Sequence, residues 1–171
     1  MDRLILGWRN VLIAGIGLLM VCSIMQVSAY AAMSDTISVS FTIDPINEIN
    51  IAGTSVTLTV NAAVAGSQPT QVSQSTTYSI STNCTANSKK LTAVINSAMP
   101  SGITLSLNVT APTGASSTGT TTITNVAADV VTGIDAVAQS DIAMTFYLNA
   151  TAAAGVVSAA SKTLTFTLVD A

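Results

Sequence analysis

The sequence predicts an all-β protein: a single antiparallel β-sandwich, immunoglobulin-like or jelly-roll in type, with about eight or nine strands. Apolar and polar residues alternate with period two in most segments that lie between turn residues. Val, Ile and Thr, which favour strands, are abundant throughout the chain. Helical spacing of apolar residues is nearly absent after residue 31. Sheets with one polar face bury their apolar faces against each other, so a sandwich is favoured and a closed barrel is the alternative.

The first 31 residues contain the parts of a secretory signal peptide. These parts are a basic region, an apolar run and a small-residue motif: Arg3 and Arg9, then Val11–Met25, then Ala29-Tyr30-Ala31. Cleavage before Ala32 leaves 140 residues, enough for one domain over 32–171. The alternative is a membrane anchor over Leu4–Met25. We expect a secreted protein, extracellular or at the cell surface, with no membrane span after cleavage.

The alternation of apolar and polar residues also predicts the positions of the strands that follow residue 45. We expect strands over 55–62, at 78–80, and over 91–95, 103–109, 120–124, 142–148 and 164–168, with a short one near 49–53. The segments 63–75 and 111–119 are rich in Gly, Pro, Ser and Thr and are predicted loops. The segment 125–140 is ambiguous between short strands and a helical turn.

The first predicted strand follows the signal directly. Its apolar face consists of Ile37, Val39, Phe41 and Ile43, and Asp44-Pro45 ends it as a candidate hinge. Burying these four side chains contributes roughly 6–12 kcal/mol. Left unpaired, such a strand is an aggregation template. Residues 34–43 therefore pair either within the chain or with a neighbouring subunit, and in the second case the head-to-tail contact builds a filament.

Charge excludes one class of partner. Residues 32–171 carry three lysines and seven acidic residues, a net charge of −4, without arginine or histidine. Nucleic acid is not expected to bind, because that requires clustered cations to displace counterions from the phosphates. The neutral Ser and Thr faces would let subunits pack side by side without repulsion.

Residue types that carry catalysis or bind metals are sparse, and we expect no catalytic residue, no cofactor and no metal site. The chain has no histidine, and the pairs Ser88-Lys89 and Ser161-Lys162 would point to opposite faces of a strand. The acidic residues lack a calcium-loop pattern, which leaves a weak calcium site as the alternative. Cys84 is the single cysteine after the signal, so no intrachain disulfide is expected. We expect a buried or incidental cysteine, and the alternatives are a reactive thiol or an intermolecular link.

Three N-glycosylation sequons, at Asn83, Asn108 and Asn149, occur about as often as chance allows. Alternation places Asn108 and Asn149 on outward faces, and these two are the candidate glycosylation sites.

Three features together are similar to a known family of proteins. They are an alternating strand directly after the signal, a predicted sandwich rich in Thr, Ser, Ala and Val, and the terminal strand "SKTLTFTLVDA". The chain resembles donor-strand-exchange fibre subunits, meaning fimbrial pilins and biofilm-matrix fibre proteins of the TasA type. The resemblance implies that residues 34–43 are the donor strand. The chain lacks the disulfide pair and the C-terminal aromatic residue of chaperone-usher pilins, so a chaperone of that kind is not implied. It lacks the long N-terminal helix of type IV pilins.

The predicted function is that of a structural subunit of an extracellular surface or biofilm-matrix filament. Its partners would be copies of itself, with other surface proteins as further candidates. The alternative is a monomeric secreted binding module for glycans or adhesion. Sugar sites stack rings on aromatics, and after the signal the chain has only two tyrosines, Tyr78 and the outward-facing Tyr147. An enzyme is the least favoured class.

Overall fold

The computed structural model describes residues 34–171, and the predicted signal peptide over 1–31 lies outside the described residues. The described chain contains nine strands and one 3-10 turn: β1 (Asn47–Ile51), β2 (Val72–Thr82), β3 (Lys89–Ile95), β4 (Ile103–Val109), β5 (Ser116–Ser117), β6 (Thr120–Thr122), β7 (Ala128–Ile134), β8 (Val137–Ala150), η1 (Ala152–Ala154) and β9 (Leu164–Asp170). Its internal contacts separate a unit ending at Thr42 from a second unit, Ile43–Ala171, which holds all of these elements.

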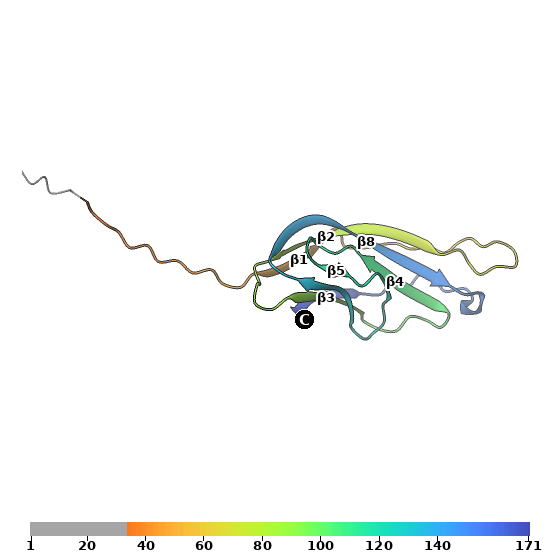
Figure 1. Ribbon diagram of the computed structural model, residues 1–171. Helices are drawn as coiled ribbons and strands as arrows, with labels where there is room; N and C mark the ends of the chain where they lie inside the picture. The colour runs from red at the N-terminus through yellow and green to blue at the C-terminus, as the bar shows by residue number, and fades with distance from the viewer. Residues whose placement is uncertain (1–33) are drawn as a thin grey trace, which may run out of the picture. The chain divides into compact units, whose positions relative to one another are not determined.

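The second unit is an antiparallel β-sandwich (Figure 1). One sheet has the strand order β1-β2-β8-β4-β6, and the other has the order β5-β7-β3-β9. Every pair of neighbouring strands is antiparallel. The predicted fold class is confirmed. In the described part of the chain, no helix is both long enough and apolar enough to cross a membrane.

The core lies between the two sheets, where apolar residues of both meet. β4 illustrates how the sequence builds it, because Leu107 and Val109 are fully buried while Thr104 points to solvent. The opposite sheet contributes the same pattern from β3, with alternate residues inside. The core consists of Tyr78, Ile80, Leu91, Ala93, Ile95, Leu107, Val109, Ile123, Val130, Val131, Ile134, Ile142, Met144 and Phe146. Period-two alternation thus becomes one buried face for each sheet.

The longest strand, β8, contains a β-bulge. Tyr78 of β2 pairs with Ile142, whereas Ile80, two residues further along β2, pairs with Gln139, three residues back along β8. The extra residue falls at 140–141, where Asp141 has a positive φ of 56°. Asp is one of the few residues that enter this region at modest cost. The bulge lets β8 continue as one strand although its inward residues change from odd to even numbers.

Some predicted element boundaries are wrong. Residues 55–62 alternate like a strand but form none, and the segment 63–75 is not all loop because β2 begins at Val72. The two-residue strand β5 lies within the predicted loop over 111–119. The ambiguous segment over 125–140 forms β7 and the start of β8. The remaining predicted strands after residue 76 are present, and of these only the strand over 103–109 has both ends as predicted.

Candidate assembly site

Residues 34–43 present their apolar side chains to solvent. Ile37, Val39, Phe41 and Ile43 are 89%, 76%, 85% and 75% exposed. No strand includes these residues, and in the described chain their backbone groups form no hydrogen bond with other backbone groups. The predicted pairing is therefore not made inside residues 34–171. This segment is called the assembly segment below.

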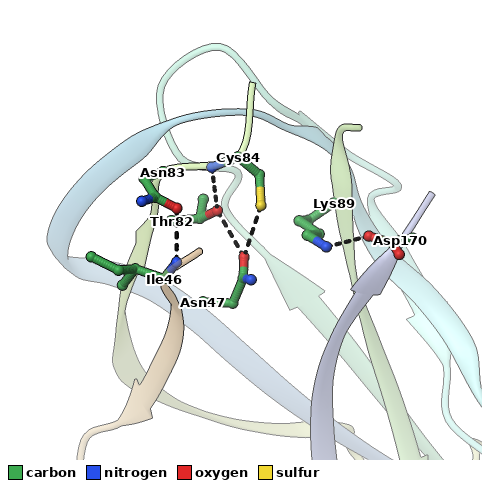
Figure 2. A network of polar contacts seen from close by, with 7 residues as sticks. All are labelled: Ile46, Asn47, Thr82, Asn83, Cys84, Lys89 and Asp170. Atoms are coloured by element: carbon green, nitrogen blue, oxygen red, sulfur yellow. Dashed lines mark hydrogen bonds and ion pairs between the residues drawn. The ribbon is translucent and has the colours of Figure 1, made fainter. Parts of the chain in front are cut away.

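The candidate hinge is held by one side chain. The carboxamide oxygen of Asn83 accepts a hydrogen bond of 2.8 Å from the backbone N–H of Ile46 (Figure 2). Its Nδ2 donates to the carbonyl of Asp44 at 2.9 Å. The backbone N–H of Asn83 also donates to the carbonyl of Ile46 at 3.2 Å. Asn83 thus binds the chain on both sides of Pro45, which has no N–H of its own to contribute.

A second polar network fastens the start of β1 to the end of β2. The hydroxyl of Thr82 donates to Oδ1 of Asn47 at 2.9 Å and accepts from the backbone N–H of Cys84 at 3.2 Å (Figure 2). The thiol of Cys84 lies 3.4 Å from the same Asn47 oxygen, as a weak donor. Cys84 is half-buried and forms no disulfide within the described residues. In this structure it supports the strand end next to the hinge.

Ion pairs link strands of the β5-β7-β3-β9 sheet. The ammonium of Lys89 at the start of β3 contacts the carboxylate of Asp170 at the end of β9 (Figure 2). The hydrogen bond that Lys89 donates to the Asp170 carboxylate raises the pKa of Lys89. Lys90 pairs with Asp129 at 3.2 Å. These ion pairs connect β3 to β9 and to β7, in addition to the backbone hydrogen bonds between the strands.

The sandwich is incompletely covered along β9, the edge strand of its sheet. Inward residues of β9 pair with β3 as Leu168 with Leu91, Phe166 with Ala93 and Leu164 with Ile95. The β3 partners are at most 1% exposed, whereas the β9 residues are only half-buried. Among the described strands, none pairs with β9 on its outer side. The apolar core therefore reaches solvent at this edge.

Residues 54–61 form a second incomplete element. Their backbone groups form no hydrogen bond with other backbone groups of the described chain, although Val56, Leu58 and Val60 alternate as in a strand. Leu58 packs against the core, and Val56 is 37% exposed. In the described chain these residues are thus a strand-like stretch without a ladder partner.

Other predicted positions lie elsewhere. Asn149 is exposed on the outer face of β8, and Asn108 is half-buried on β4, where its amide donates to Thr120 at 3.2 Å. Tyr147 is half-buried on the same sheet, and Tyr78 is inside the core. Among residues 34–171, no three His, Cys, Asp or Glu side chains gather as metal ligands would.

The fold and the site define a class: a β-sandwich with an unpaired apolar N-terminal segment and an open sheet edge. No protein-family model matches the chain, and no curated protein matches it significantly. The alternating pattern predicted the apolar side chains of residues 34–43, but it did not predict the contacts of Asn83 with Asp44 and Ile46. Only its sequon drew attention to Asn83, and no local pattern links it to Ile46, 37 residues away.

Proposed function

We propose that the protein is a non-enzymatic structural subunit of an extracellular surface or biofilm-matrix filament. One observation carries the proposal: four large apolar side chains alternate along the assembly segment, and all are at least 75% exposed. Burying them on a neighbour contributes roughly 6–12 kcal/mol, which is comparable with the stability of a whole domain. A second copy of the chain is the partner.

The open edge at β9 supports the proposal from the receiving side. A strand added beside β9 would pair with its free backbone groups and cover Leu164, Phe166 and Leu168. The seven residues of β9 fall within the length of the assembly segment. Because the donor and the receiving edge are different surfaces of one chain, the contact is heterologous and continues from subunit to subunit.

Electron microscopy of the secreted chain over 32–171 tests the proposal. The intact chain is expected to form filaments. The double variant Val39→Asp with Phe41→Asp should abolish them, because it places two charges on the face that must be buried. Ser38→Asp with Ser40→Asp is the matched control, since it adds the same charge on the polar face and should leave filaments intact.

A synthetic peptide of residues 34–43 provides the second part of the test. Added to the Val39→Asp, Phe41→Asp chain, it should raise the melting temperature with increasing peptide concentration, as expected of a ligand that binds the folded state. Fully stable monomers from the intact chain, together with no response to the peptide, would contradict the proposed function.

A further inference from the structure

We infer that Asn83 directs residues 34–43 to a neighbouring subunit and keeps them from completing the sandwich of their own chain. The inference rests on the proposed function and adds a determinant of partner choice. The two outcomes, self-insertion and donation, use the same apolar face, so burial alone does not decide between them. They differ in the course of the chain over Asp44–Ile46.

The positions of the strand ends define what self-insertion requires. β1 starts at Asn47, which pairs with Thr82 at the end of β2. β9 finishes at Asp170, which pairs with Lys89 at the start of β3. β1 and β9 are in contact, and Figure 2 shows Asn47 near the Lys89–Asp170 pair. β1 therefore begins at the end of the sandwich where β9 finishes, and the two strands run in opposite directions.

Self-insertion beside β9 consequently needs a chain reversal just before β1. From Asn47, β1 runs into the sandwich. A segment lying along β9 of its own chain would have to run out of the sandwich, parallel to β9, and then turn back within residues 44–46. No turn or bend occurs at residues 43–46. Donation to another subunit needs no such reversal.

Asn83 holds the backbone groups that a reversal would move. It binds the carbonyl of Asp44 and both the N–H and the carbonyl of Ile46. Pro45 has a fixed φ and restricts the backbone of Asp44 before it. The freedom needed for a reversal thus falls mainly on Ile46, whose N–H and carbonyl are both bound by Asn83. Self-insertion would break these three hydrogen bonds, whereas donation keeps them.

The variant Asn83→Ala tests the inference in the full secreted chain, and Asn50→Ala is the matched control. Asn50 is exposed on β1. We expect Asn83→Ala to lower the filament yield by roughly tenfold, since losing even one or two hydrogen bonds shifts the balance by about that factor. Its monomer should show slow hydrogen exchange over residues 34–43 that does not depend on protein concentration. Asn50→Ala should behave as wild type.

If Asn83→Ala does not fold, a milder variant still tests the inference. Asn83→Asp keeps an acceptor for the N–H of Ile46 but loses the donor to Asp44, so its yield should lie between those of wild type and Asn83→Ala. Wild-type filament yield from both variants, with unprotected residues 34–43 in their monomers, overturns the inference and leaves the proposed function standing. Absence of filaments from the wild-type chain overturns the proposed function, and the inference with it.

Discussion

The hydroxyl of Tyr78 donates a hydrogen bond of 2.7 Å to the backbone carbonyl of Thr110, just beyond β4. Tyr78 is 1% exposed, and its ring belongs to the core. The bond crosses beneath β8, which separates β2 from β4 in the sheet. It therefore joins two strands that share no backbone pairing. It also gives the buried Tyr78 hydroxyl a hydrogen-bond partner, without which its burial would cost free energy.

Tyr78→Phe should lower the free energy of unfolding by about 1–2 kcal/mol, because the Thr110 carbonyl loses its donor while the ring still fills its place. Urea denaturation of the two proteins measures the difference. An unchanged midpoint would mean that water replaces the hydroxyl without loss.

Alkaline pH should destabilise the domain through the same residue. Burial raises the pKa of Tyr78 to about 12, above the value of about 10 expected in the unfolded chain. A raised folded pKa means that this stability is fully present below pH 10 and is lost as the pH rises toward 12, by roughly 3 kcal/mol. Denaturation at pH values between 9 and about 12 measures the loss.

Tyr78→Phe serves as the reference for this measurement. The pKa of Lys89 is also raised, because Lys89 donates a hydrogen bond to the Asp170 carboxylate, so Lys89 contributes in the same direction. Both proteins share that contribution, so the difference between their pH profiles isolates Tyr78. Parallel profiles would contradict the prediction.

Gly102→Ala should destabilise the domain more than the same change at Gly114. Both glycines have a positive φ, +79° and +88°, which costs an alanine about 1–2 kcal/mol. At Gly102 the new Cβ would also lie 2.7 Å from Oγ1 of Thr151 and 3.0 Å from Ala154, whereas Gly114 has open space. Adding an overpacking cost, we expect about 2–5 kcal/mol at Gly102. Thermal unfolding compares the two, and equal losses would argue against the steric contact.

Filament formation should protect the amides of β9. As an edge strand, β9 has one side without a partner in the described chain. If a neighbour's assembly segment pairs there, hydrogen exchange over residues 34–43 and along β9 should slow at least about 100-fold in filaments. Lys162 and β6, an edge strand of the other sheet, should exchange as in the monomer. Protection of β6 in place of β9 would assign the receiving edge elsewhere.

The period-two pattern predicted the sandwich and many of its strands, because one buried face on each sheet is a local property of sequence. The bounds of β4 were predicted correctly at 103–109. The start of β8 was missed for a physical reason. Its inward residues are Val137 and Gln139 before the bulge and Ile142 after it, so the alternation changes parity at 140–141 and the pattern breaks.

The alternation of apolar and polar residues did not predict which strands pair with each other. Residues 55–62 alternate as well as any strand, yet they form no ladder, since pairing depends on which backbone lies alongside. The same holds for the site. Its apolar residues were predicted from their spacing, but the bonds of Asn83 to Asp44 and Ile46 are long-range contacts between polar groups that are common in any loop.

The hinge also determines how the molecule would carry force. A pull on residues 34–43 enters the sandwich at the peptide groups beside Pro45, which Asn83 holds. From there it passes to β1, whose only ladder within residues 34–171 is five residue pairs with β2. Under tension, the carboxamide of Asn83 would be loaded before that ladder begins to separate. One side chain would thus set the first resistance of the chain to extension.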